Sequence, residues 1–192
     1  MPILSMEMLL NDTREAQRAH HVLTFLQQFY VQSMPSQCPS SSHVSIPASL
    51  AVPLVSVSRH LSIAPIVTYA DTVLWNYCLK DPSQPLSTSN IGIRDLFTGD
   101  AQEEHFFLTS AKIEIRGWEA LEIMDRRIKA AQEETDVRID EMTEDLERLS
   151  VVISDIADIL DSVRDGCDPY WFYFTFRPVR CYYRFPNTFL LT

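Results

Sequence analysis

Glycine and cysteine are scarce in this chain, and it has no long apolar run. Four glycines in 192 residues disfavour glycine-rich phosphate loops and turn-rich β folds, and therefore favour helices. The four cysteines form no CxxC pair and fit no zinc spacing, which predicts a reducing, cytoplasmic location. No run approaches the ~18 apolar residues of a spanning helix. The N-terminus also lacks the basic and apolar regions of a signal peptide, so no membrane partner is expected.

Charge and length narrow the class of protein further. The formal net charge is −10 and the isoelectric point is about 4.9. Such a surface repels the phosphate backbone, so nucleic acid is not expected as a partner. A chain of 192 residues corresponds to one domain, or to one domain with a small companion. At this size roughly 70% of the unfolded surface can be buried, so a substantial core is possible.

The first 80 residues predict a small N-terminal helical domain. Helices are expected over 12–32, 50–60 and 66–79, the first with a capping group at Asp12 and the third with Pro65 in its first turn. The apolar stripe expected on the first helix consists of Ala19, Val22, Leu23, Leu26 and Tyr30. A polar stretch that begins DPSQPLSTSN predicts a linker over 81–104.

The second half predicts long helices. A helix is expected over 106–118, followed by a helical region over 119–165 with a break at 133–136. Gly166 is placed to end this region in a left-handed cap, and Asp168 with Pro169 begins a new helix. Apolar residues at spacings of three and four form a seam that we interpret as an internal packing face: Ile139, Met142, Leu146, Leu149, Ile153, Ile156, Leu160 and Val163.

The helix that begins at Asp168 carries aromatic rings beside a guanidinium. Phe172 and Phe176 are four residues apart on one stripe, and Tyr173 and Arg177 are four apart on the next. This arrangement suits an apolar ligand with one carboxylate. The aromatic rings bury the apolar part of the ligand, and the guanidinium donates two parallel hydrogen bonds to its carboxylate. The alternative is that the two phenylalanines are core residues and that Arg177 extends to solvent.

Three segments resemble the indoleamine 2,3-dioxygenase family in its fungal form. They are LAVPLVSVSRHLSIAPIVTYADTVLWNY at 50–77, HFFLTSAKIEIRG at 105–117 and VRDGCDPYWFYFTFRP at 163–178. The resemblance implies an all-α fold, a small N-terminal helical domain joined to a large haem-binding helical domain. It also implies haem b as cofactor and L-tryptophan or a related indole amine as substrate. The implied reaction adds O2 to L-tryptophan to give N-formylkynurenine, the first step of the kynurenine pathway.

The resemblance also implies a set of substrate-binding residues. Tyr69, Thr72 and Val73 fall where the family lines its indole pocket, and Phe106 and Ser110 fall near the substrate and the haem. Phe172 and Tyr173 match a position usually held by two phenylalanines, so the tyrosine is a departure, and Arg177 falls where the family binds the substrate carboxylate. The alternative is that Tyr69, Val73 and Phe106 pack as ordinary core residues and that Ser110 bonds back to a helix carbonyl.

One expected feature is missing from the resemblance. In the family a histidine far downstream ligates the haem iron, and here the chain after Pro178 reads VRCYYRFPNTFLLT. We therefore expect a C-terminally truncated member, with 105–178 as the N-terminal part of the large domain and 179–192 as an aberrant tail. No catalytic or metal residue is assigned, and haem binding and activity are expected to be impaired. The histidines are expected to be solvated or capping: His20, His21, His43, His60 and His105.

Two other functions are compatible with the pattern. The chain is then either a truncated, non-catalytic homologue that binds an indole or haem weakly, or binds neither, or an acidic helical interaction protein that uses the seam of 139–163. The loss of downstream segments that would cover apolar faces also predicts self-association through those faces.

Overall fold

The computed structural model is predominantly helical, which confirms the all-α expectation, and it describes residues 3–34, 44–132, 138–180 and 189–191. The helices are α1 (Thr13–Ser33), α2 (Ala48–Leu61), α3 (Ala101–Gln132), α4 (Ile139–Asp161), α5 (Val163–Gly166), α6 (Pro169–Trp171) and α7 (Arg177–Arg180), with short turns η1 (Leu9–Asn11), η2 (Ala70–Leu74) and η3 (Phe172–Phe176). Strand β1 (Val44–Ile46) pairs in parallel with β4 (Phe189–Leu191), and β2 (Tyr77–Leu79) pairs antiparallel with β3 (Ile91–Ile93). Among these described residues, no helix is long and apolar enough to cross a bilayer.

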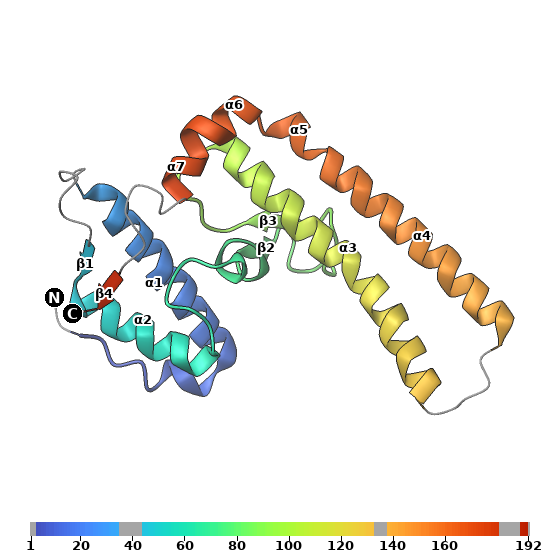
Figure 1. Cartoon of the computed structure of the whole chain (residues 1–192), viewed down its shortest axis with the longest axis horizontal. Helices are drawn as coiled ribbons and strands as arrows, with labels where there is room; N and C mark the ends of the chain where they lie inside the picture. The colour runs from blue at the N-terminus through green and yellow to red at the C-terminus, as the bar shows by residue number, and fades with distance from the viewer. Residues whose placement is uncertain (1–2, 35–43, 133–137, 181–188, 192) are drawn as a thin grey trace.

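Helices α1 and α2 lie side by side in the blue and cyan part of Figure 1. The side chain of Asp12 accepts hydrogen bonds from the N–H groups of Arg14 and Glu15, at 2.8 and 3.4 Å, so α1 begins where predicted. Leu23 of α1 packs with Leu54 and Val57 of α2 in a buried cluster. Both predicted helices are confirmed to within two residues at each end.

The predicted apolar stripe of α1 is only partly right. Leu23 is buried, and Ala19 and Tyr30 pack against core clusters, whereas Val22 and Leu26 are exposed. The buried residues of α1 are a mixture of apolar and polar side chains: Ala16, His20, His21, Leu23, Thr24, Phe25, Gln27, Gln28 and Val31. The two histidines bond to segments distant in sequence, as shown below, which allows them to be buried. Gln28 donates to the carbonyl oxygen of Val179, but the side-chain oxygens of Gln27 and Gln28 have no partner among the described residues.

The predicted helix over 66–79 is also wrong, because only the turn η2 forms before strand β2. The cause is tertiary. The side-chain amide of Asn76 donates to the carbonyl oxygen of Asp95 at 2.8 Å, and its oxygen accepts from the N–H of Asp95 at 3.0 Å. These two bonds hold the chain beside residues 91–95, where Tyr77–Leu79 pairs with β3.

Helices α3 and α4 form a long hairpin that projects away from α1 and α2 (Figure 1). Ion pairs join the two helices: Arg116 with Asp155 at 2.7 Å, and Arg148 with Glu119. The predicted helix over 106–118 is confirmed within α3. The predicted break at 133–136 lies outside the described residues.

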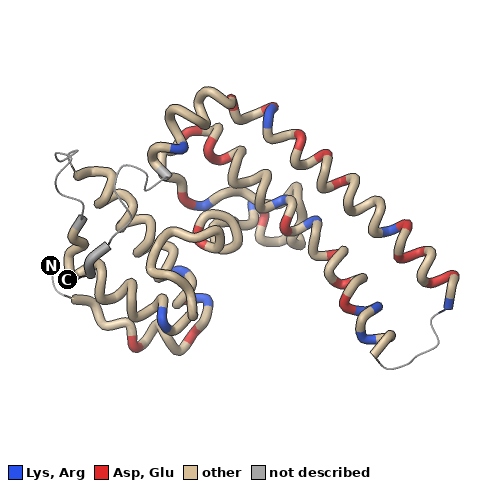
Figure 2. The backbone as a smooth tube through the Cα atoms, in the orientation of Figure 1, with Lys and Arg blue, Asp and Glu red and all other residues tan. Residues whose placement is uncertain are grey.

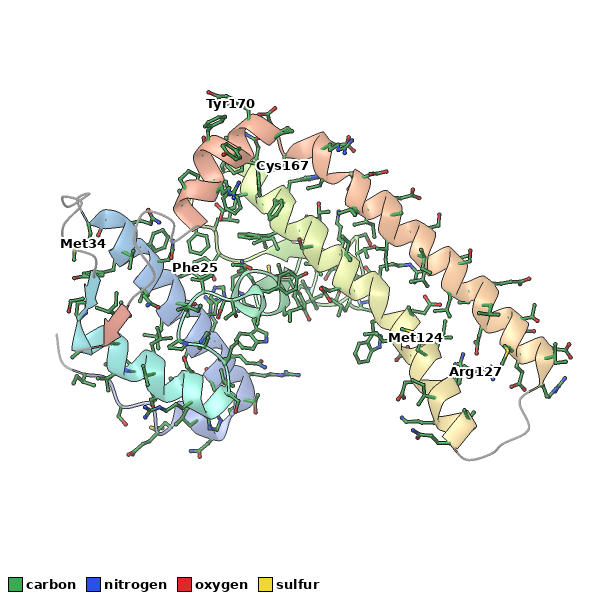
Figure 3. All side chains as sticks on the ribbon, viewed as in Figure 1. Phe25, Met34, Met124, Arg127, Cys167 and Tyr170 are labelled. Atoms are coloured by element: carbon green, nitrogen blue, oxygen red, sulfur yellow. The ribbon has the colours of Figure 1, made fainter. Side chains whose placement is uncertain are left out.

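The seam predicted on α4 is wrong for most of its members. Val152 is fully buried, whereas five seam residues are exposed: Ile139, Met142, Leu146, Ile153 and Leu160. The physical reason is that α4 carries apolar residues on two stripes, and only one can pack on α3. Further apolar side chains are exposed on α3, among them Trp118 and Met124 (Figure 3). Self-association through such faces stays a prediction.

The turn after α5 differs from its prediction in one respect. Gly166 is not left-handed, since the glycine with positive φ among the described residues is Gly99, at 72°. Gly166 instead allows a close approach, because a Cβ there would lie 2.5 Å from Cγ of His105. The next start signal is confirmed: the side chain of Asp168 accepts from the N–H of Trp171 at 2.9 Å, with Pro169 at the first position.

A central core joins the early and late parts of the chain. Phe25 of α1, labelled in Figure 3, stacks on Phe97 at 4.1 Å between centroids, and the same cluster contains Val73, Phe107 and Phe176. The predicted division into 1–80, a linker over 81–104 and 105–178 stays a prediction. Of the predicted aberrant tail, residues 181–188 and 192 lie outside the described part.

Candidate functional site

A cluster of aromatic rings forms where η3 meets the first turns of α3. The rings of Phe106 and Phe172 lie 5.0 Å apart between centroids, and both contact Phe176 at 5.7 Å. Phe176 also meets Phe107 at 5.6 Å, and both are fully buried. Phe106 and Phe172 are half-buried. The core interpretation is therefore confirmed for Phe176, whereas Phe106 and Phe172 keep part of their rings accessible at the edge of the core.

Ser110 lies one turn along α3 from this ring pair. Its hydroxyl donates to the carbonyl oxygen of Phe106 at 3.3 Å. This is the back-bonding predicted for an ordinary helix serine. The bond directs the hydroxyl along α3 and leaves its oxygen lone pairs as acceptors.

Tyr173 and Arg177 form an exposed pair on the outer side of the same helical segment. The guanidinium carbon of Arg177 lies 5.2 Å from the centroid of the Tyr173 ring, a cation–π contact. Tyr173 is 53% exposed. Within the described part of the chain no carboxylate pairs with Arg177, so its guanidinium keeps donors for a carboxylate from outside.

The three predicted residues of η2 and its start differ in exposure. Thr72 and Val73 are buried, and Thr72 donates to the carbonyl of Thr68 at 3.3 Å. Tyr69 is half-exposed, and its hydroxyl donates to Glu114 at 2.7 Å. Val73 belongs to the central core, and Phe106 and Phe172 pack against that core. The structure thus gathers Val73, Phe106 and Phe172 on one core and leaves Tyr69 at its edge.

A cavity of about 500 Å³, here called the apolar cavity, lies between η2 and α3. Its size is that of a small-molecule site. Its lining is apolar except for Glu114 and the tyrosine hydroxyl: Val73, Leu74, Tyr77, Leu86, Ala111, Glu114, Ile115, Trp118 and Leu121. Of the predicted residues, Val73 lines it directly and Tyr69 reaches it through Glu114.

Two adjacent histidines of α1, His20 and His21, form hydrogen bonds with Asp71 in the turn η2. His20 Nδ1 lies 2.7 Å from Asp71 Oδ1, and its Nε2 lies 3.1 Å from the carbonyl oxygen of Ala64. Both neighbours are acceptors, so the ring bonds to both only when it carries two protons. The other oxygen of Asp71 accepts from the N–H and hydroxyl of Thr68, at 2.8 and 2.7 Å. His20 and Asp71 are both fully buried.

His21 links the same turn to Asp95. His21 Nδ1 lies 2.7 Å from the carbonyl oxygen of Asp71, and its Nε2 lies 3.1 Å from Asp95. Burial lowers the pKa of His21, the positive charge of Arg18 adds to this, and the bonds to Asp71 and Asp95 oppose it. Desolvation acts to raise the pKa of Asp95, but Arg18 at 2.6 Å and His21 outweigh it and lower that pKa.

The expectation of solvated or capping histidines is therefore wrong for His20 and His21. The signal was present in the sequence: His20 lies four residues after Ala16 and three before Leu23, both buried. The predicted stripe shares Leu23 with this buried side but also contains Val22 and Leu26, which are exposed. The acceptors, Asp71 and Asp95, are more than 50 residues away, so pattern alone could not pair them.

The described histidines do not fit as axial ligands of a haem. His20 and His21 have both ring nitrogens engaged, and His105 Nε2 lies 2.8 Å from the carbonyl oxygen of Ser162. His60 is exposed on α2, which packs on α1 rather than on the ring cluster. His43 lies outside the described residues. Among the described residues, no group of histidine, cysteine and acidic side chains could hold a metal ion.

Residues 1–184 match the family model for indoleamine 2,3-dioxygenase. The chain belongs to this family. Its curated relatives include the indoleamine 2,3-dioxygenase 2 of Homo sapiens, 34% identical over 176 residues, which are 90% of this chain and 41% of that protein. The 6-hydroxytryptophan 2,3-dioxygenase fscD of Fusarium equiseti is 32% identical over 178 residues, 93% of this chain and 42% of that protein.

A third relative, the indoleamine 2,3-dioxygenase of Saccharomyces cerevisiae, is 30% identical over 177 residues, 90% of this chain and 38% of that protein. The chain therefore spans about two fifths of the length of these relatives. The predicted resemblance is confirmed, with both fungal and mammalian proteins among the relatives.

Proposed function

We propose that this chain carries the indole-binding wall of a dioxygenase that acts on L-tryptophan or a related indole amine. The observation that carries the proposal is the half-buried ring pair of Phe106 and Phe172, 5.0 Å apart, on the core that contains Val73. A planar apolar ring is best recognised by such a pair at the edge of a packed core. The names of the relatives, which are dioxygenases of tryptophan-like compounds, support the same class of ligand.

Five of the predicted residues then have a chemical role. Phe106, Phe172 and Val73 exclude water from the indole ring. Arg177, whose guanidinium has no carboxylate partner among the described residues, binds the substrate carboxylate by a forked pair of hydrogen bonds. Tyr173 lies under that guanidinium, so its ring supports Arg177, and its extra hydroxyl remains on the exposed side.

By family, the proposed reaction is the haem-dependent addition of O2 to the indole, which gives N-formylkynurenine from L-tryptophan. Haem b would supply the activation of oxygen. Because the described histidines do not fit as axial ligands, we assign no reaction step to the residues of this chain. We assign to them the binding and orientation of the substrate. A cytoplasmic location and the division into a small domain and part of a large haem-binding domain belong to this proposal as well.

A second candidate is an acidic helical interaction protein. The observation that favours it is the exposed apolar stripe of α4, where Leu146 and Ile153 are more than 60% exposed, flanked by the acidic residues visible along α4 in Figure 2. This second candidate function predicts that the chain has no affinity for tryptophan.

Isothermal titration calorimetry of the 192-residue chain with L-tryptophan, L-alanine and indole tests the proposal. We expect saturable binding of L-tryptophan and no binding of L-alanine. Arg177→Gln should weaken L-tryptophan about tenfold, since a charged hydrogen bond contributes about 1.5–3 kcal/mol, and should leave indole unchanged. Arg164→Gln, at an exposed arginine on α5, is the matched control. No affinity for L-tryptophan, or equal affinity in Arg177→Gln, would contradict the proposal.

A further inference from the structure

A second cavity, here called the arginine cavity, lies between the first half of α1 and the segment around β2. Its volume is about 380 Å³, within the range of ~300–1,000 Å³ of small-molecule sites. It shares Leu74 and Tyr77 with the apolar cavity, but the rest of its lining is different. Those other residues are Arg14, Gln17, Arg18, Trp75 and Arg94.

Three arginines from two parts of the chain line this cavity. Arg14 and Arg18 are one turn apart on α1, so they lie on the same side of the helix. Arg94 follows β3, and its N–H donates to the carbonyl oxygen of Asn76 at 2.8 Å, which fixes its backbone beside Tyr77. The three arginines meet because the fold brings α1 against the residues that flank β2 and β3.

The arginines of this cavity are not neutralised equally. Arg18 pairs with Asp95 at 2.6 Å, whereas no carboxylate of the described residues pairs with Arg14 or Arg94. The chain as a whole carries a net charge of −10, and acidic residues recur along α3 and α4 in Figure 2. Two unpaired guanidiniums beside a third are therefore a local reversal of the overall charge, and they favour an anion at this one place.

Two aromatic rings form the apolar part of the same lining. Trp75 is half-buried, and its ring meets the buried ring of His20 edge to face, at 6.0 Å and 88°. Tyr77 is half-buried in β2, opposite Ile93 of β3. Trp75 thus packs on a buried ring and Tyr77 packs against the central core, and both offer contact for a planar ring next to the positive charge.

We propose that the arginine cavity binds a small aromatic molecule that carries a phosphate group. A carboxylate has two oxygens and is satisfied by one guanidinium fork, whereas a phosphate has three free oxygens and can accept from both Arg14 and Arg94. The aromatic part packs on Trp75 and Tyr77. This site is separate from the indole-binding wall, and it needs neither haem nor Arg177.

The first experiment titrates the 192-residue chain with phenyl phosphate, inorganic phosphate, benzoate and phenol by calorimetry at low ionic strength. We expect saturable binding of phenyl phosphate that is tighter than that of each other probe, and that weakens as salt is added because the arginines are exposed. Equal binding of benzoate overturns the choice of phosphate, and equal binding of inorganic phosphate overturns the role of the rings. If phenyl phosphate does not bind at concentrations up to about 10 mM, its binding free energy is weaker than ~3 kcal/mol, and the proposed site is refuted.

The second experiment assigns the binding to the cavity. Arg14→Gln and Arg94→Gln should each weaken phenyl phosphate about tenfold, which is ~1.4 kcal/mol. Arg59→Gln removes an exposed arginine from the last turn of α2, away from the cavity, and should leave the affinity unchanged. Circular dichroism checks that each variant is folded. An unchanged affinity in both cavity variants, or an equal loss in Arg59→Gln, would place the binding elsewhere and refute the proposal.

Discussion

The buried pair of His20 and Asp71 is expected to be a main determinant of the stability of this chain. Both side chains are fully buried, and Asp71 accepts from His20 and from two donors of Thr68. Asp71→Asn replaces one carboxylate oxygen with an amide N–H₂ group, so it leaves a buried donor of His20 or of Thr68 without an acceptor. A buried donor or acceptor left without a partner costs about 1–3 kcal/mol. A domain is stable by only about 5–15 kcal/mol, so the loss should be large.

Urea unfolding followed by circular dichroism measures this loss, with His20→Gln, Asp71→Asn and the double variant forming a cycle. Each single variant should lower the free energy of unfolding by about 1–3 kcal/mol, and the double variant should lose less than the sum, by about 0.5–3 kcal/mol. Lys129→Gln is the control, because Lys129 and Asp125 form an exposed pair at 2.6 Å. It should cost less than about 1 kcal/mol.

The reasoning is refuted if the single variants cost no more than Lys129→Gln. In that case the contacts of His20 and Asp71 would contribute nothing beyond those of a solvated pair. It is also refuted if the double variant loses the full sum, since the two side chains would then act independently.

Three other predictions follow from single contacts. Gly166→Ala places a Cβ 2.5 Å from the ring of His105 and should destabilise the chain by about 1–3 kcal/mol in thermal unfolding. Gly117→Ala, whose Cβ would meet only one side-chain atom at 3.7 Å, should instead stabilise it by about 0.5–1 kcal/mol, and a reversed order would contradict the reasoning. Because the pKa of His21 is lowered from its ordinary 6.5, the unfolded state binds the proton more readily. Stability should therefore fall as the pH drops below about 6.5, and His21→Leu should reduce this slope in urea midpoints measured from pH 7.5 to 5; an unchanged slope would exclude the role. The buried carboxylate of Glu103 accepts from the N–H groups of residues 97 and 98, both at 2.7 Å, so Glu103→Ala should cost about 1–3 kcal/mol in the same urea assay, and a loss below 0.5 kcal/mol would contradict it.

Local signals predicted the elements that depend on a few neighbouring residues. Asp12 begins α1 and Asp168 with Pro169 begins α6 as expected, because a cap is satisfied within three residues. The ring pair of Phe106 and Phe172 also formed, although 66 positions separate its members and only the family resemblance connected them. The roles of these residues in binding remain predictions.

Signals that depend on distant partners were misinterpreted. Val22 and Leu26 are more apolar than His20 and His21, yet the two histidines are buried and the two aliphatic side chains are exposed. Hydrophobicity ranks isolated side chains, whereas burial depends on whether a distant segment supplies the acceptor. The amide of Asn76 had the same effect on residues 77–79, which became a strand because Asp95 offered both a donor and an acceptor.

The sequence by itself determined the family, the helical class and the starts of α1 and α6, because motif residues, low glycine content and caps act over short distances. It did not determine the start of α3, which begins at Ala101 within the predicted linker over 81–104. Only the tertiary structure decided which face of α1 and of α4 is buried. It alone paired His20 with Asp71 and gathered Arg14, Arg18 and Arg94 around one cavity. The reason is physical: the free energy of a polar or charged side chain is set by the groups around it, and those groups come from segments whose positions the local sequence does not encode.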